Sequence, residues 1–305
     1  MADRPCASDS PNHGDDREAA FLELRPLLLS VAYRMSGSRH DAEDLVQDAW
    51  LRWRAAPQAT VLDPRAYLVT VVTRLAMDHF RSARAQREQY VGPWLPEPVL
   101  NAETWLGPLE TVEQREQLAL AVVALYERLT PLQRAVIVLR EAFAYPYDEI
   151  ARVLGSSSAA CRQAHRRAKA HLGSDRPAMG GIGDHERLLR ELLAAFSSGD
   201  LQGLEQLLAA EIVLVADGGG KVPAARRPLL GPQAVTQFLS GLLRQAPSGV
   251  RVEVADINGW PALVVEIDKT VSHVLSIAGQ AQIQHIAIVR NPAKLASVAR
   301  ARHNR

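Results

Sequence analysis

The most informative segment of the sequence reads Tyr147-Asp-Glu-Ile-Ala-Arg-Val-Leu-Gly155, followed by Ser156-Ser-Ser-Ala-Ala-Cys161-Arg-Gln-Ala-His-Arg-Arg-Ala-Lys169. A short amphipathic helix that ends at a glycine, followed by a serine-capped second helix, predicts a helix-turn-helix. A narrow apolar stripe on the second helix is expected to pack inward, and it consists of Ala160, Cys161, Ala164, Ala168 and Leu172. Cys161 is therefore expected to be a small core residue and not a reactive thiol.

The other face of the second helix is polar and basic. Arginine and glutamine suit bidentate contacts with base edges, and a basic row also neutralises phosphates. An ordinary amphipathic helix with cations near its C-terminus is the alternative, since the helix dipole favours them there. We interpret the face as DNA-binding, with candidate residues Ser157, Ser158, Arg162, Gln163, Arg166, Arg167 and Lys169.

Outward from this segment, the chain as far as Leu172 shows apolar residues at three- and four-residue spacing, which predicts helices. Asp63 before Pro64 and Thr130 before Pro131 are helix-start signals. No run in this half alternates like a strand, so it is expected to be all-α. The predicted helices cover residues 19–35, 38–54, 64–87, 112–129, 132–143, 147–154 and 157–172.

Two breaks divide the chain further. Residues 91–110 contain four prolines and predict a stiff linker between two helical bundles, and the Gly-rich residues 173–184 predict a flexible tether. Beyond the tether, helices precede an antiparallel meander with a hairpin signal at Asn258-Gly259, which predicts an α+β domain. Its expected helices are 185–197, 201–209 and 232–244, and its expected strands are 212–216, 250–257, 262–267, 270–277 and 281–289.

Composition and charge exclude several classes of protein. The chain has 305 residues, 47% hydrophobic and 23% charged, which excludes wholesale disorder. No apolar run reaches the roughly 18 residues of a membrane helix, and the N-terminus lacks a signal peptide, so a cytoplasmic protein is expected. Two cysteines give neither a disulfide framework nor a Cys-based zinc site, and we expect no metal or cofactor.

The net charge of +1 is an average over segments of opposite sign. Residues 152–171 contain five basic and no acidic residues, whereas residues 1–50 contain five basic and ten acidic ones. Such segregation predicts separate binding faces, some of them attractive to an anionic polymer. Solvated helix faces are the alternative interpretation of each cluster.

Three further segments carry a family resemblance, namely Asp41-Ala-Glu-Asp-Leu-Val-Gln-Asp48, residues 63–78 and residues 129–143. Together with the helix-turn-helix, they make residues 19–172 resemble an extracytoplasmic-function sigma factor of bacterial RNA polymerase. The resemblance implies a region-2-like domain (19–90) that binds the polymerase clamp and the promoter −10 element. It also implies a linker (91–111) and a region-4-like domain (112–172) that binds the −35 element.

Three shorter motifs are similar to marks of a sigma-factor subgroup with a fused SnoaL-like, NTF2-fold domain. They are Trp94-Leu-Pro-Glu-Pro98, Asp217-Gly-Gly-Gly-Lys221 and Asn291-Pro-Ala-Lys-Leu295, in which Ala293 stands where the subgroup usually has Asp. The resemblance implies an NTF2-like regulatory cone over residues 185–290, followed by a basic tail (291–305). Disorder is expected for the tail and for residues 1–18, with contact of the tail with DNA or the linker as the alternative.

The resemblance also assigns roles to residues. The acidic helix would bind core RNA polymerase through Asp41, Glu43, Asp44, Gln47 and Asp48. The −10 helix would track promoter DNA through Arg74, Asp78, His79, Arg81, Arg84 and Arg87, and the loop 55–62 would capture an extruded base. We further expect the linker and the 217–221 loop to meet. The interdomain set is Trp94, Leu95, Pro96, Glu97, Pro98, Asp217, Gly218, Gly219, Gly220, Lys221, Asn291, Pro292, Lys294 and Leu295.

The predicted function is therefore promoter recognition by a free monomer that joins core polymerase, and not an enzymatic activity. Trp94 is expected either to need a partner surface or to plug the core of the first bundle. One alternative is an enzyme or small-molecule sensor that uses Asp217 with His273 or His285 in the cone. Another is a ligand-controlled helix-turn-helix repressor, against which the −10-like helix and the acidic helix argue.

Overall fold

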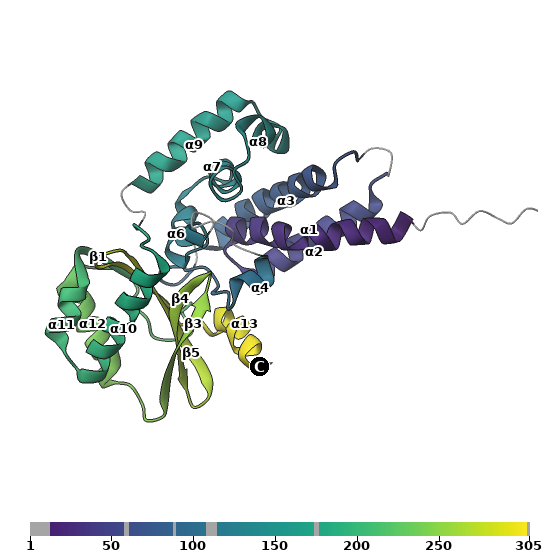
Figure 1. Ribbon diagram of the computed structural model, residues 1–305. Coiled ribbons are helices and arrows are strands. Elements are labelled where there is room, and N and C mark those ends of the chain that lie inside the picture. Colours follow the sequence, from purple (N-terminus) through teal and green to yellow (C-terminus); the bar gives the residue numbers. More distant parts are fainter. Residues whose placement is uncertain (1–12, 58–60, 88–89, 108–114, 174–176, 304–305) are drawn as a thin grey trace, which may run out of the picture.

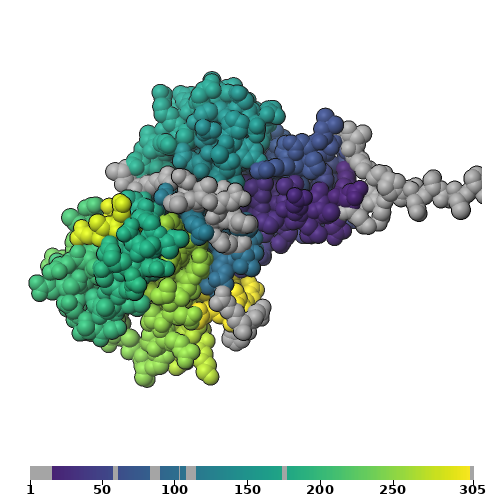
Figure 2. Space-filling view, viewed as in Figure 1, coloured from purple at the N-terminus to yellow at the C-terminus, as the bar shows by residue number. Residues whose placement is uncertain are grey.

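The computed structural model describes residues 13–57, 61–87, 90–107, 115–173 and 177–303. Two groups of helices and one α+β domain follow one another along the chain (Figure 1). The two helical groups lie against each other, and the α+β domain lies below both of them (Figure 2). The predicted fold class, helical domains followed by a domain with a mixed sheet, is confirmed.

The first helical group contains α1 (His13–Ser36), α2 (Arg39–Ala55) and α3 (Pro64–Arg87). The Ser38 side chain caps α2, and Asp63 accepts a hydrogen bond from the Ala66 amide at 3.1 Å, as the start signal before Pro64 predicts. Helix α1 begins earlier than expected, so the prediction of disorder is wrong for residues 13–18, and residues 1–12 lie outside the described part. Arg17 explains the difference, because its guanidinium donates to the Ala56 carbonyl at 2.9 Å and lies 4.9 Å from the Trp53 ring centroid.

The second helical group is built from shorter pieces than expected. It contains α6 (Leu120–Leu125), a 3-10 turn (Tyr126–Arg128), α7 (Pro131–Ile137) with a π-helical continuation (Val138–Ala142), α8 (Tyr147–Leu154) and α9 (Ser158–Leu172). The single helix expected over 112–129 is therefore wrong within its described residues. Side chains of the C-terminal domain take the carbonyls that a continuous helix would use: Trp260 donates to Arg115 at 2.9 Å, and Asn258 donates to Leu118 at 2.9 Å.

The linker follows the surface of the C-terminal domain. Residues 95–100 are buried, Leu100 forms an antiparallel bridge with Ile257, and the short helix α4 (Ala102–Leu106) comes next. The tether is attached as well, since Gly180 donates to the Gly279 carbonyl at 3.1 Å and α10 begins at Ile182. Flexibility predicted for residues 173–184 is therefore wrong for the part just before α10.

The C-terminal domain has one six-stranded mixed sheet in the order β2-β1-β6-β5-β4-β3, with β1 and β6 parallel and the other pairs antiparallel. The hairpin predicted at Asn258-Gly259 joins β3 to β4, and both residues have positive φ angles of 58° and 78°. The elements are α10 (Ile182–Ser198), α11 (Leu201–Leu207), β1 (Leu208–Asp217), β2 (Leu229–Leu230), α12 (Pro232–Arg244), β3 (Val250–Ile257), β4 (Trp260–Ile267), β5 (Thr270–Gly279), β6 (Ile283–Val289) and α13 (Pro292–His303).

The two faces of this sheet have different neighbours (Figure 1). One face packs on α10, α11 and α12 of the same domain, through residues such as Leu214, Leu263 and Ile288. The opposite face packs on α13, on the linker and on α6 of the second helical group, through residues such as Val264 and Val289. Period-two alternation places these residues on opposite faces, so β1, β4, β5 and β6 each contribute to both cores.

The tail is ordered, contrary to expectation. Residues 292–303 form α13, whose Leu295 and Val298 are buried against the sheet. Arg302 ties the end of this helix to the sheet through Glu266 at 2.9 Å and Glu253 at 2.5 Å. Separately, none of the described helices is both long and apolar enough to cross a membrane.

Candidate nucleic-acid interface and the junction between the domains

The helix-turn-helix has the predicted local geometry. Gly155 ends α8 in the left-handed conformation at φ 61°, where a side chain would be strained, and the Ser157 hydroxyl accepts from the Ala160 amide at 3.2 Å to cap α9. Cys161 is buried, and burial raises the pKa of its thiol. Five of the candidate residues face solvent along α9, namely Arg162, Gln163, Arg166, Arg167 and Lys169.

The candidate −35 residues are not equally available. Ser157 is used as the cap, and the Ser158 hydroxyl donates to Asp148. Lys169 lies 3.1 Å from Glu141; burial raises the pKa of this carboxyl, but hydrogen bonds from Lys169 and His165 outweigh that effect and hold it below its ordinary value. Within the described part of the chain, Arg166 and Arg167 have no ion pair, and they form the free cationic part of the face.

The candidate −10 residues on α3 are largely engaged. Arg74 donates to the Val153 carbonyl of α8 at 3.1 Å, so it connects the two helical groups. Asp78 pairs with Arg81 at 2.8 Å, and His79 lies 3.2 Å from Asp41 on α2, a residue that the sequence assigned to the polymerase. The side chains of Arg84 and Arg87 lie outside the described residues. The described side chains of α3 therefore do not form a free row of arginines.

A pocket of about 550 Å³ lies where α2 ends beside α3. Its lining includes Tyr67, Thr70, Arg52 and Arg74, and the Thr70 hydroxyl donates to the Ala66 carbonyl at 2.7 Å. The sequence placed this site in the loop 55–62, of which residues 58–60 lie outside the described part. Ala55 and Ala56 of that loop do line the pocket, and Arg74 was a candidate −10 residue. Arg52, Tyr67, Thr70 and Val71 were missed, because nothing in the linear sequence connects Arg52 with Thr70.

The acidic residues of α2 divide into two sets. Asp44, Gln47 and Asp48 are exposed and available to a partner. Glu43 instead accepts hydrogen bonds from Arg39 at 3.1 Å and from the Trp105 indole of the linker at 3.1 Å. The linker thus reaches onto the helix that was assigned to polymerase binding.

A buried arginine joins the two helical groups. Arg134 on α7 donates to the Arg34 carbonyl of α1 at 3.0 Å, pairs with Glu127 at 2.5 Å, and lies 4.7 Å from the Phe80 ring centroid on α3. Arg34 is also fully buried, and this burial lowers the pKa of its guanidinium to about 10. Sequence reasoning missed both arginines, because a buried charge has no pattern of its own.

Asp217 is the centre of the junction between the linker and the C-terminal domain. Its carboxylate is fully buried at the end of β1 and accepts from the Tyr90 hydroxyl at 2.6 Å, the Leu95 amide at 2.9 Å and the Gly219 amide at 2.9 Å. Lys294 of α13 completes the set at 2.7 Å. The linker, the loop and the tail therefore meet at one carboxylate.

Aromatic rings of the linker enclose the ammonium group of Lys294. Its Nζ lies 4.1 Å from the Trp94 ring centroid and 5.1 Å from that of Tyr90, and it also donates to the Leu95 carbonyl. The Trp94 ring also packs against Gly37, where a Cβ would come within 2.5 Å of the ring. Trp94 thus has two neighbours, the turn before α2 on one hand and helix α13 on the other. It does not serve only to fill the core of the first bundle.

The remaining motif residues support this junction. Asn291 donates to the Tyr90 hydroxyl at 2.8 Å and accepts from the Ala293 amide at 3.1 Å, which places Pro292 and buried Leu295 at the start of α13. Gly218 and Gly220 continue the loop, and Lys221 is exposed.

The linker residues 96–98 contribute as well. Pro96 and Pro98 are buried on either side of Glu97. Glu97 accepts from the Arg39 amide at 2.8 Å and so helps to cap α2.

Asn258 forms a second junction, which the sequence indicated only as a turn. Its side chain donates to the Tyr33 hydroxyl at 2.7 Å and to the Leu118 carbonyl at 2.9 Å, and it accepts from the Val99 amide at 2.9 Å. One fully buried amide thus contacts both helical groups and the linker. Burial, the largest effect, raises the pKa of the Tyr33 hydroxyl well above its ordinary value and keeps it neutral.

The catalytic pair that the sequence offers, Asp217 with His273 or His285, is not formed among the described side chains. Asp217 makes its hydrogen bonds to Tyr90, Leu95, Gly219 and Lys294, and neither His273 nor His285 is among its partners. Burial, followed by the charge of Arg290, lowers the pKa of His273 to about 4. In the described ranges, no group of three or more His, Cys, Asp or Glu side chains could hold a metal ion.

Comparison with known proteins identifies both helical groups. Residues 20–86 match Sigma-70 region 2, and residues 119–172 match Sigma-70, region 4. The chain is 41% identical over 243 residues to the ECF RNA polymerase sigma factor SigJ of Mycobacterium tuberculosis, covering 78% of each protein. It is 30% identical over 286 residues to the probable ECF RNA polymerase sigma factor SigI of that species, covering 92% of this chain and 95% of SigI.

The likeness extends to three dimensions. The crystal structure of Mycobacterium tuberculosis SigJ superposes with a TM-score of 0.74 at 31% sequence identity, covering 92% of this chain and 98% of the SigJ chain. The match therefore spans the C-terminal domain as well as the two helical groups. This chain belongs to the extracytoplasmic-function sigma factors of bacterial RNA polymerase, and it carries a fused C-terminal α+β domain.

Proposed function

We propose that this sigma factor binds core RNA polymerase through the exposed acids of α2 and reads the −35 and −10 promoter elements through α9 and α3. It acts by binding and catalyses no bond chemistry of its own. The observation that carries this proposal is the exposed Arg162–Lys169 face on a correctly capped recognition helix. The Asp44–Asp48 face has the opposite charge, which suits a basic protein partner and repels DNA.

The pocket beside α3 is the site we assign to an extruded −10 base. An aromatic ring (Tyr67), a hydroxyl (Thr70) and guanidinium groups give stacking and hydrogen bonds to a base that has left the duplex. Arg74 lines this pocket and is also bonded to Val153 of the helix-turn-helix. Binding of a base in this pocket is therefore linked, through Arg74, to the position of the second helical group.

The arrangement of the two helical groups is a closed one. Elements centred about 25 base pairs apart are separated by roughly 85 Å of B-DNA at ~3.4 Å per base pair. In the structure α3 and α8 are in direct contact (Figure 1). Binding both elements together therefore requires the two groups to separate and the Arg74–Val153 and Arg134–Arg34 contacts to break.

We infer that the C-terminal domain controls this separation by holding the linker. Between the end of α3 at Arg87 and the start of α6 at Leu120, 32 intervening residues could span about 100 Å when extended. That length is sufficient only when the linker is free. Residues 95–100 are instead buried on the sheet, and the Asp217 and Asn258 junctions fix them there.

Transcription in vitro with purified core polymerase tests the assignment of the surfaces. We expect the full-length protein to co-migrate with core polymerase and to start transcription from a cognate template. Asp48→Arg should abolish co-migration, because it reverses a charge on α2. Arg166→Ala should leave co-migration intact and weaken promoter binding by roughly 1–3 kcal/mol. The assignment of the surfaces would be contradicted if Asp48→Arg still co-migrated with core polymerase and Arg166→Ala still bound the promoter as tightly as the parent protein.

A matched pair of glycine substitutions tests the restraint. A Cβ at Gly219 would lie 2.3 Å from the Asn291 amide nitrogen and 3.0 Å from the Tyr90 hydroxyl, whereas a Cβ at Gly199 would have nothing within 4 Å. Both glycines have positive φ angles, so Gly219→Ala and Gly199→Ala share the backbone strain. We expect only Gly219→Ala to raise transcription at limiting protein concentration. Equal transcription by both variants would contradict the restraint.

A further inference from the structure

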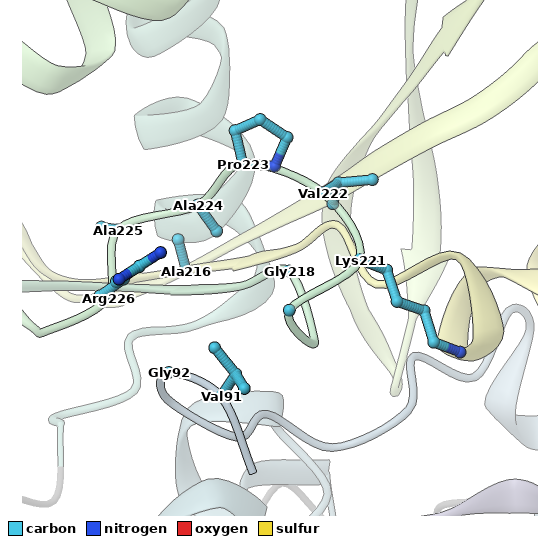
Figure 3. Close-up of a pocket in the computed structure, with 11 residues that line it drawn as sticks. Val91, Gly92, Ala216, Gly218, Lys221, Val222, Pro223, Ala224, Ala225 and Arg226 are labelled. Atoms are coloured by element: carbon cyan, nitrogen blue, oxygen red, sulfur yellow. The ribbon is translucent and has the colours of Figure 1, made fainter.

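A pocket of about 460 Å³ lies between the linker and the C-terminal domain (Figure 3). Val91 and Gly92 form the linker wall, and Ala216, Gly218 and residues 220–226 form the other wall. Its volume falls in the range of small-molecule sites. The pocket is separate from the Asp217 carboxylate, which points to the other side of β1 and is occupied by Lys294.

The glycines of the loop allow a close approach of the two walls. A Cβ at Gly220 would come within 3.0 Å of Val91, and the Gly92 backbone faces Arg226, whose Cα would lie 3.9 Å from an added Cβ. Figure 3 shows Val91 directed at the loop from the linker, and Arg226 beside Ala216. A molecule in this pocket would touch both the linker and the C-terminal domain.

The surroundings of the pocket are cationic. Arg226 lines it, and no carboxylate among the described residues pairs with this side chain. Arg290 lies behind the loop, where its Nη1 donates to the Pro223 carbonyl at 2.6 Å and its Nε is buried without a hydrogen-bond partner in the described structure. Lys221, the other cation of the lining, extends away from the pocket in Figure 3. Asp217, at the end of β1, is already paired with Lys294 at 2.7 Å.

One part of the lining is apolar and comes from the side chains of Val91, Ala216, Val222, Pro223 and Ala224. An apolar wall beside an unpaired guanidinium favours a ligand that has both an apolar body and a negative charge. We propose that this pocket binds a small organic carboxylate, with Arg226 pairing with the carboxylate and the Val91–Ala224 walls enclosing the apolar body.

Binding at this position would act on the linker. The ligand would contact Val91 and Gly92 only while the linker lies against the 218–226 loop, so its affinity is higher for the closed arrangement. By linkage, the ligand stabilises that arrangement and lowers promoter binding. This regulatory consequence rests on the restraint proposed above, whereas the binding site itself does not.

Titration calorimetry on the full-length chain tests the site, with octanoate as the probe and octanamide as its uncharged counterpart. We expect saturable binding of octanoate, at least tenfold tighter than that of octanamide. Arg226→Ala should weaken octanoate binding at least tenfold. The matched control is Arg227→Ala, which removes an exposed neighbouring cation outside the lining and should change the affinity less than twofold.

Three outcomes would overturn the proposed ligand site. No saturable octanoate binding, equal binding of the amide, or equal weakening by the two arginine variants would show that Arg226 does not form a carboxylate site. Transcription in vitro separates this failure from that of the proposed function. If the protein transcribes normally without octanoate and binding is absent, only the ligand site is wrong. If binding is present and no promoter is transcribed, the site stands and the proposed function fails.

Discussion

The two faces of the C-terminal sheet bury similar aliphatic side chains but have different roles. The face with Leu214 and Ile288 packs on helices of its own domain, so its core cannot separate without unfolding. The face with Val264 and Val289 packs on the linker, α6 and α13, so part of its core belongs to other domains. One sheet thus supplies both a folding core and a docking surface. The docking surface can open while the folding core stays intact.

The largest expected effect comes from Lys294→Met on the docking face. Removal of the ammonium leaves the fully buried Asp217 carboxylate without its counter-ion, which costs about 3–5 kcal/mol when a buried pair is broken. We expect the junction to open while the sheet persists. Hydrogen exchange should show faster exchange of the Leu95 amide and unchanged protection of β5 and β6. Uniform loss of protection would contradict the distinction between the faces.

Leu214→Ala tests the folding face. A fully buried leucine replaced by alanine costs about 2–5 kcal/mol, and here the loss falls on the helix-covered core. We expect a lower midpoint for unfolding of the whole C-terminal domain, seen by denaturant titration with circular dichroism. Selective exposure of the linker, with the domain still folded, would be the contrary result.

Acid should weaken the contact between α10 and the start of β4. His185 on α10 is buried 5.0 Å from the Trp260 ring centroid, and burial lowers its pKa from 6.5 to about 4. Between these values the unfolded chain binds a proton that the folded protein does not, so stability falls as the pH decreases. The loss approaches roughly 3 kcal/mol by pH 4. Unfolding free energies between pH 7 and pH 4 measure it.

The variant His185→Phe keeps an aromatic ring beside Trp260 and removes the titrating group. Its unfolding free energy should fall less steeply over the same pH interval. His273, whose pKa is also lowered to about 4, supplies a residual slope in both proteins. An identical pH dependence for the variant and the parent protein would show that His185 is not buried as a neutral group.

Asn258→Gly should give the smallest effect of the series. Glycine accepts the positive φ of 58°, so the turn is kept while the bonds to Tyr33, Leu118 and Val99 are lost. Unpaired buried groups cost about 1–3 kcal/mol, and water entering the space reduces this. Chemical shifts of the linker amides should change, with the hairpin register preserved. Loss of the β3–β4 pairing would instead assign Asn258 to the turn alone.

Short-range patterns predicted much of the local structure. The caps at Ser157, Thr130 and Asp63, the glycine that ends α8 and the Asn258–Gly259 turn lie where the sequence placed them. Such features depend on neighbours within four residues, so they can be read along the chain. The helix expected over 112–129 and the disordered tail were wrong because distant groups, Trp260 and Asp217, decide the local backbone there.

The candidate site divides in the same way. The basic face of α9 was predictable from helical spacing, because its stripe and its charges lie on one helix. The sequence could not show that Arg74 bonds to α8, that Glu43 accepts from Trp105, or that Arg134 joins the two helical groups. These partners lie 79, 62 and 100 residues apart, and no local pattern connects them.

The sequence by itself determined most of the helices, the basic face of α9 and the family, since each follows from periodicity, capping or motifs along the chain. The tertiary structure decided which charges remain free and which hold the domains together. The physical reason is burial. An arginine or an aspartate has the same intrinsic chemistry everywhere, but Asp217 and Arg134 become structural only where packing removes water and supplies a partner from another domain.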